Sequence, residues 1–78
     1  MNVTVYTKPD CPPCNATKKY LPRDGIEFTE VDLTNNEDAY NLVTSLGHKY
    51  TPVVVSGSTH WSGFRPDKIA SLKVKKSS

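Results

Sequence analysis

Two cysteines, Cys11 and Cys14, are the residues of this chain whose type and spacing most directly indicate chemistry. They follow the alternating run from Val3 to Tyr6, a pattern typical of a β-strand. A Cys-x-x-Cys pair at a strand-to-helix corner can close into a disulfide and reopen without moving the fold. Because the chain has no other cysteine, this pair predicts a redox-active dithiol as the catalytic site.

Two other roles for the cysteine pair are weaker. As a structural staple, the bridge would contribute only roughly 2 kcal/mol, because so short a loop removes little freedom from the unfolded chain. As a zinc site, the pair needs two more ligands, and His48 and His60 are too far apart for the usual metal-binding spacing. We therefore expect no bound metal, and no cofactor besides the redox-active disulfide itself.

The place of each cysteine in the expected helix assigns its role. If Cys11 is the N-cap, its sulfur faces the first-turn amides and the positive end of the helix dipole, which favour the thiolate. Cys14 lies one turn inside, so we expect Cys11 to attack and Cys14 to resolve the mixed disulfide. Pro12 and Pro13 have no N–H, which leaves the Cys14 N–H as the main donor. We expect a reducing dithiol with a moderately lowered pKa at Cys11.

Three further segments are candidates for contact with a substrate or partner. Thr51-Pro52 precedes a predicted strand, and the residues alone favour a trans bond, as most X-Pro bonds are trans. Lys8 either stabilises the thiolate, meets an acidic partner, or is simply an exposed lysine. The run from Trp61 to Asp67 contains a Trp, a Phe and an Arg, which either form core and cap or dock a partner.

The hydrophobic pattern predicts an α/β chain with the order β-α-β-α-β-β-α. The right-handed crossover rule makes the first two strands parallel neighbours, and a hairpin completes a four-stranded mixed sheet flanked by three helices, a thioredoxin fold. The expected elements are a strand around Val3 and Val5, a helix at 11–21, a strand at 26–33, a helix from Asn35-Asn36 to Gly47 that buries Ala39, Leu42, Val43 and Leu46, a hairpin of 52–55 and 59–62, and a helix from Pro66 that buries Ile69 and Leu72.

Length and charge limit the remaining function classes. The 78 residues suffice for one domain with a small core, expected at 1–72, and for a basic, disordered tail at 73–78. The net charge of +2 is weak and depends on the lysines of that tail, so no basic stripe indicates nucleic-acid binding. No leader and no membrane-spanning stretch is evident. We therefore expect a cytoplasmic protein, and a monomer because nothing in the sequence indicates an obligate dimer. In that reducing compartment a close cysteine pair is more plausibly catalytic than structural.

Together these residues resemble one family, the NrdH redoxins. The resemblance covers nearly the whole chain except the tail, and its most specific part is the run from Trp61 to Asp67. Between the cysteines, Pro12-Pro13 replaces the Val-Gln or Met-Gln pair more usual in the family. The matching residues are Thr4-Val5-Tyr6-Thr7-Lys8-Pro9, Cys11 and Cys14, Ala16-Thr17-Lys18, Gly25-Ile26, Val31-Asp32-Leu33, Leu46-Gly47, Pro52-Val53-Val54 and Trp61-Ser62-Gly63-Phe64-Arg65-Pro66-Asp67.

The resemblance implies a glutaredoxin-like sequence on a thioredoxin fold, and a defined electron route. Thioredoxin reductase, using NADPH, would reduce the dithiol, which would pass electrons to the large subunit of class Ib ribonucleotide reductase. The resemblance also implies a cis Thr51-Pro52 bond that faces the dithiol, where the backbone of Thr51 pairs with a substrate strand. The residues expected to contact a substrate or partner are Lys8, Pro12, Pro13, Thr51, Pro52, Trp61, Ser62, Gly63, Phe64, Arg65 and Asp67.

The same resemblance bears on glutathione. Glutaredoxins hold this tripeptide with a Gly-Gly segment and an acidic residue at the start of the last helix, whose N–H groups bind its carboxylate. Here Ser62-Gly63 replaces the Gly-Gly, and Arg65-Pro66 follows. Because the proline removes a donor, we expect poor glutathione binding. A glutathione-dependent glutaredoxin, a general protein disulfide reductase and a non-catalytic adaptor that binds through 61–65 are the alternatives.

Overall fold

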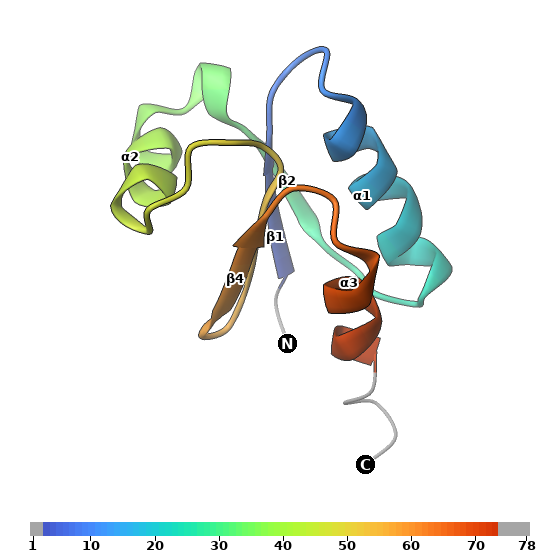
Figure 1. Ribbon diagram of the computed structural model, residues 1–78. Helices are drawn as coiled ribbons and strands as arrows, with labels where there is room; N and C mark the ends of the chain where they lie inside the picture. The colour runs from blue at the N-terminus through green and yellow to red at the C-terminus, as the bar shows by residue number, and fades with distance from the viewer. Residues whose placement is uncertain (1–2, 74–78) are drawn as a thin grey trace.

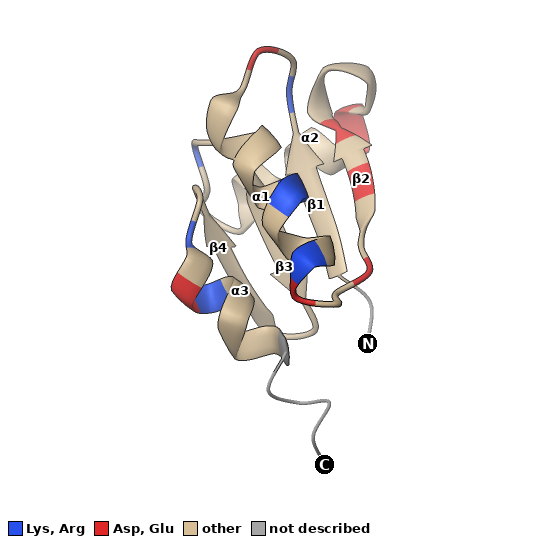
Figure 2. Cartoon of the chain, turned by 90° about the vertical axis from the view of Figure 1, so that its right-hand side faces the viewer, with Lys and Arg blue, Asp and Glu red and all other residues tan. Residues whose placement is uncertain are grey.

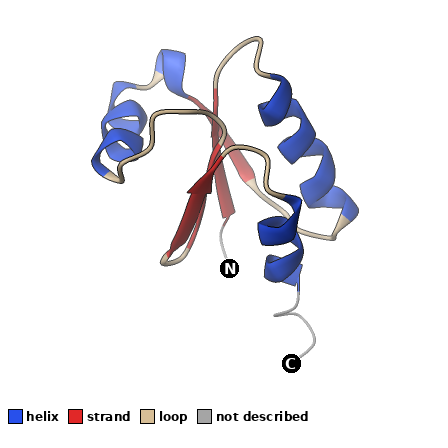
Figure 3. Cartoon of the chain, in the orientation of Figure 1, coloured by secondary structure: helices blue, strands red, loops and turns tan. Residues whose placement is uncertain are grey.

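The computed structural model describes residues 3–73, and its elements follow the predicted order with one added turn (Figures 1 and 3). The added element is a short 3-10 helix, η1, between the second strand and the second helix. The elements are β1 (Val3–Thr7), α1 (Pro12–Arg23), β2 (Thr29–Asp32), η1 (Leu33–Asn35), α2 (Glu37–Ser45), β3 (Val53–Ser56), β4 (Thr59–Ser62) and α3 (Pro66–Lys73).

A four-stranded mixed sheet runs through the middle of the molecule in the order β2-β1-β3-β4. β1 pairs with β2 in parallel and with β3 antiparallel, and β4 pairs antiparallel with β3. The parallel pair is the one expected for two strands joined through a helix. Figure 1 shows α1 and α3 on one face of this sheet and α2 on the other. The predicted sheet and its three flanking helices are confirmed.

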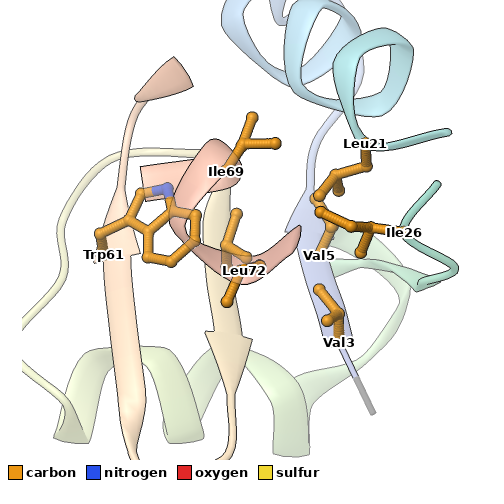
Figure 4. Packing of buried hydrophobic residues seen from close by; sticks show 8 residues of the cluster. Val3, Val5, Leu21, Ile26, Trp61, Ile69 and Leu72 are labelled. Carbon is orange, nitrogen blue, oxygen red and sulfur yellow. The ribbon is translucent and has the colours of Figure 1, made fainter. Parts of the chain in front are cut away.

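The larger hydrophobic core lies between the sheet and the two helices α1 and α3. Neighbouring strands supply paired residues, Val5 opposite Val54 and Val54 opposite Trp61, and Trp61 is only 4% exposed. Figure 4 shows Ile69 and Leu72 of α3 beside Trp61, so their predicted burial is confirmed. Burying one such side chain contributes about 1.5–3 kcal/mol. The buried members are Val3, Val5, Leu21, Ile26, Val54, Trp61, Ile69 and Leu72.

A smaller core lies on the other face, beneath α2. This helix begins where the side chain of Asn36 accepts a hydrogen bond of 3.0 Å from the Ala39 N–H, which confirms the predicted asparagine cap. Ala39 and Val43 are buried as predicted, but Leu42 is 43% exposed because it lies away from the sheet. The buried residues of this core are Tyr6, Ala39, Val43 and Val53.

Both predicted bounds of the second strand are wrong. The sequence pattern extends the second strand over 26–33, whereas β2 covers only Thr29–Asp32. Ile26 packs into the core from the connection before the strand. At the other end, Asp32 accepts a hydrogen bond of 2.8 Å from the Thr34 N–H, and this local capping turns the chain into η1.

The first helix is longer than its predicted end at Leu21, because α1 continues to Arg23. Pro22 lies in the last turn and cannot donate a backbone hydrogen bond. The turn is nevertheless closed by the Asp24 N–H, which donates to the carbonyls of Tyr20 and Leu21 at 3.2 and 3.1 Å. The helix therefore ends two residues later than the hydrophobic pattern suggests.

The last helix, α3, includes Lys73, the first residue of the predicted tail. The other residues of the predicted disordered tail, 74–78, lie outside the described residues. Within residues 3–73, no helix has both the length and the apolar character needed to cross a membrane.

An ion pair joins α1 to β2 on the side of the molecule seen in Figure 2, where basic positions of α1 and acidic positions of β2 are coloured. The Lys18 ammonium lies 2.9 Å from Glu30 Oε2, and the buried Thr7 hydroxyl donates to the same oxygen at 2.9 Å. The hydrogen bond from Lys18, and secondarily the one from Thr7, lower the pKa of Glu30. The contact links α1 to β1 and β2 through one carboxylate.

Two histidines tie the connection after α2 to β4. His48 Nε2 lies 2.7 Å from His60 Nδ1, and the two rings meet edge to face with centroids 4.8 Å apart. The hydrogen bond needs one neutral ring nitrogen as acceptor, so it is lost when both rings are protonated. Partial burial, and secondarily the charge of His60, lower the pKa of His48 below its usual 6.5.

We predict that stability falls when the pH is lowered from about 7.5 to about 5.5, because the unfolded chain then binds a proton at residue 48 more readily than the folded protein does. Carboxylates contribute little in this window, since the pKa values of Glu30 and Asp32 are lowered by hydrogen bonds from Lys18 and Thr34. Urea unfolding at both pH values measures the effect, and His48→Asn should flatten it. An equal pH dependence in His48→Asn would contradict this assignment.

Candidate active site

The corner between β1 and α1 places both cysteines at the start of a helix. Asp10 takes a left-handed backbone conformation, with φ 55°, that turns the chain toward α1, and Asp is one of the few residues other than glycine that visit this region readily. Cys11 has an extended backbone and caps the helix. Pro12 and Pro13 fill the first helical positions, where a missing N–H breaks no intrahelical bond.

Cys11 and Cys14 form a disulfide across this first turn, with their Cα atoms 5.2 Å apart. The Cys14 N–H donates to Cys11 Sγ at 3.2 Å, which confirms that it is the first-turn donor. Cys14 is 1% exposed and Cys11 is 5% exposed. Both sulfurs are therefore well covered, and the arrangement favours Cys11 as the sulfur that carries negative charge when the bridge is open.

The connection between α2 and β3 brings a second segment to the cysteines. The Thr51-Pro52 bond is cis, as the resemblance implies and contrary to the expectation from the residues alone. Thr51 Oγ1 lies 3.3 Å from Cys11 Sγ. Sequence analysis assigned a role only to the backbone of Thr51 and missed its hydroxyl. The sequence does contain a signal for this role, because the residue directly before the proline is a threonine, whose hydroxyl can donate a hydrogen bond.

The segment after β4 reaches the same place through the backbone. The Gly63 N–H donates to the Pro52 carbonyl at 2.8 Å, and Gly63 has φ 85°, a conformation that favours glycine. Trp61 lies in the core, and Phe64 packs edge to face against Tyr20 at 5.0 Å. Trp61 is therefore a core residue, and Phe64 is a partly buried residue packed against that core.

The exposed part of this segment is polar. Ser62 is half-buried, Arg65 and Asp67 are exposed, and Arg65 Nε lies 3.5 Å from Asp67 Oδ1. Pro66 begins α3 as predicted. In residues 3–73, the side chain of Thr51 reaches Cys11 Sγ, whereas no hydrogen bond or ion pair joins Arg65 or Asp67 to the cysteines.

The surface around the dithiol is formed by Lys8, Pro12 and Pro13, all of which are exposed. A pocket of about 440 Å³ begins beside Lys8 and Thr51 and continues beneath α2. Within the described part of the chain, no three histidine, cysteine or acidic residues gather as they would around a metal ion. The chemistry that these residues can perform is thiol-disulfide exchange.

A helix-capping Cys-x-x-Cys disulfide opposite a cis-proline, on a mixed sheet of this topology, defines a thiol-disulfide oxidoreductase of the thioredoxin fold. The family model "Glutaredoxin" matches residues 3–61. The chain is 38% identical over 72 residues to the glutaredoxin-like protein NrdH of Escherichia coli K12, covering 92% of this chain and 89% of that protein. The chain belongs to the glutaredoxin family and, within it, to the NrdH glutaredoxin-like proteins.

Two further comparisons agree. The Gene 56 protein of Mycobacterium phage L5 is 42% identical over 72 residues, which cover 90% of this chain and 70% of that protein. The structure of E. coli NrdH-redoxin, a protein described as having a thioredoxin-like activity profile, superposes with a TM-score of 0.89 at 38% identity, covering 92% of this chain and 95% of that one. The predicted family and the predicted thioredoxin fold are confirmed.

We predict that Thr51→Val raises the pKa of the Cys11 thiol, because the hydroxyl 3.3 Å from Cys11 Sγ can donate to the thiolate and the methyl group cannot. A hydrogen bond to a charged group contributes about 1.5–3 kcal/mol. Titration of the thiolate absorbance of the reduced protein measures the midpoint. Thr29→Val, an exposed threonine on β2, is the matched control. An unchanged midpoint in Thr51→Val would show that the hydroxyl does not act on the thiolate.

Proposed function

We propose that this protein is a dithiol electron donor to class Ib ribonucleotide reductase and that thioredoxin reductase, using NADPH, reduces it. The observation that carries the proposal is the Cys11–Cys14 disulfide at the start of α1, facing the Thr51–Pro52 bond, in a chain of the NrdH type. In this proposal the protein acts in the cytoplasm as a monomer, where cellular reductants keep close cysteine pairs reduced.

The exchange runs in two steps that conserve electrons and protons. The Cys11 thiolate attacks one sulfur of the substrate disulfide, which forms a mixed disulfide and releases the other substrate sulfur as a thiolate that takes up a proton. Cys14 then loses its proton and attacks Cys11 Sγ, which releases the second substrate thiol. Two electrons have passed to the substrate, and the Cys11–Cys14 disulfide that remains is the state of this structure.

The structure gives physical support for Cys11 as the attacking residue. Its sulfur accepts the Cys14 N–H at 3.2 Å and lies 3.3 Å from the Thr51 hydroxyl, so two donors are available to a thiolate there. Cys14 is almost completely covered, at 1% exposed. A buried thiol has little access to a disulfide of another protein, but it can attack the mixed disulfide that has formed at the adjacent Cys11. This is the reaction of a resolving cysteine.

A glutathione-dependent glutaredoxin is the main alternative, and the start of α3 argues against it. Pro66 is the first residue of α3 and has no N–H to offer a carboxylate. Arg65 is already paired with Asp67 at 3.5 Å. These features support the expectation of poor glutathione binding.

We predict that the oxidised protein consumes NADPH with thioredoxin reductase about tenfold or more faster than with glutathione and glutathione reductase, since losing a donor to a carboxylate costs about 1.5 kcal/mol or more. Cys11→Ser should abolish turnover with both reducing systems. If the protein were a non-catalytic adaptor, the same substitution would leave its activity intact. In a second stage, class Ib ribonucleotide reductase and insulin compete as disulfide substrates.

Each stage can fail separately. Faster turnover with glutathione would make the protein a glutaredoxin. Turnover with thioredoxin reductase, but equal rates on insulin and on ribonucleotide reductase, would make it a general protein disulfide reductase.

A further inference from the structure

The pocket of about 440 Å³ beside the dithiol has three features that together indicate what it binds. The first is its position. It is lined by residues from the β1–α1 corner, from α2 and from the α2–β3 connection, and it includes Thr51. Because Thr51 Oγ1 is 3.3 Å from Cys11 Sγ, a molecule lying in the pocket reaches the redox site. Its volume is within the range of pockets that hold several side chains or a small ligand.

The second feature is charge. Lys8 and Lys49 line the pocket, and both side chains are exposed. Its lining contains no carboxylate. The ion pairs found in residues 3–73 are those of Lys18 with Glu30 and of Arg65 with Asp67, so neither lysine of the pocket has an acidic partner there. The two charges are therefore free to attract an anionic group of an incoming molecule.

The third feature is exposed aromatic surface. Tyr40 is 57% exposed and Tyr50 is 76% exposed, and both line the pocket. The structure exposes one other large hydrophobic side chain within residues 3–73, Leu42. Two of the three exposed large hydrophobic residues of this region thus line the pocket that includes Thr51 and Lys8. Exposed aromatic residues next to basic ones are the composition typical of protein-binding surfaces.

We propose that this pocket, lined by Lys8, Lys49, Tyr40 and Tyr50, docks an acidic segment of the substrate protein that flanks its disulfide and contains an apolar side chain. The proposal rests on the proposed function, because the docked chain presents its disulfide to Cys11. The carboxylates face the two lysines, and the apolar side chain packs on the tyrosines. Docking selects which disulfide is presented and leaves the exchange chemistry unchanged.

The test is single-turnover reduction of peptide disulfides by the pre-reduced protein, without any reductase. Three peptides of equal length contain a cysteine in mixed disulfide with 2-mercaptoethanol and a nearby Phe, and their flanking residues are Glu, Gln or Lys. Bis(2-hydroxyethyl) disulfide, which is small and uncharged, reports the dithiol chemistry alone. The readout is the ratio of second-order rate constants for the Glu and Lys peptides, measured by chromatography of the released thiols.

We predict that the Glu peptide reacts about fivefold faster than the Lys peptide at low salt, a size expected for two exposed ion pairs, and that added salt reduces this ratio. The double substitution Lys8→Gln, Lys49→Gln should bring the ratio close to one. Lys19→Gln is the matched control, because Lys19 is an exposed lysine on α1 outside the pocket. That variant should keep the wild-type ratio.

The outcomes separate the two proposals. Equal rates for all three peptides, a preference for the Lys peptide, or an unchanged ratio in the double variant would overturn the docking proposal while leaving the proposed function intact, provided that the small disulfide is reduced. Failure to reduce even the small disulfide would remove the proposed function, and the docking proposal with it.

Discussion

The hydrogen bond from the Cys14 N–H to Cys11 Sγ is the interaction on which the rest of the site depends. At 3.2 Å it is the backbone contact that a thiolate at Cys11 would keep when the disulfide opens. Most helix N-termini offer several N–H groups, but Pro12 and Pro13 offer none. The geometry of α1 therefore matters more here than in a corner with several donors. The burial of Leu21 and the Lys18–Glu30 ion pair hold α1 against the sheet in the turns that follow Cys14.

The other half of the site depends on segments that are distant in sequence. The sheet pairs β1 antiparallel with β3, so the C-terminal end of β1 and the N-terminal end of β3 lie at the same end of the sheet. Thr51 lies at this end of the sheet and reaches Cys11. The Gly63 N–H, in the segment after β4, donates a hydrogen bond to the Pro52 carbonyl. The His48–His60 hydrogen bond joins the α2–β3 connection, which contains Thr51, to β4. The site thus combines three separate segments: the β1–α1 corner, the Thr51–Pro52 segment beside it, and the segment after β4 that holds Pro52.

The sequence predicted most of this fold, because alternation in the strands and the capping residues of the helices are local signals. Asn36, Pro66 and the Cys-x-x-Cys pair were found in this way. The errors arose where tertiary contacts outweighed local pattern, as at Ile26, which is buried without being in a strand. The Thr51 hydroxyl and the pocket beneath α2 could not be predicted, since both depend on which side chains the fold brings together across the chain.

The central claim is that Cys11 attacks and that Cys14 resolves. The most direct measurement is mass spectrometry of the reduced Cys14→Ser and Cys11→Ser proteins after brief exposure to bis(2-hydroxyethyl) disulfide. The account predicts a stable adduct of one 2-mercaptoethanol at Cys11 in Cys14→Ser, and little adduct in Cys11→Ser, where the remaining thiol is the one that is almost completely covered. An adduct that forms as quickly at Cys14 in Cys11→Ser would contradict the assignment of the two roles.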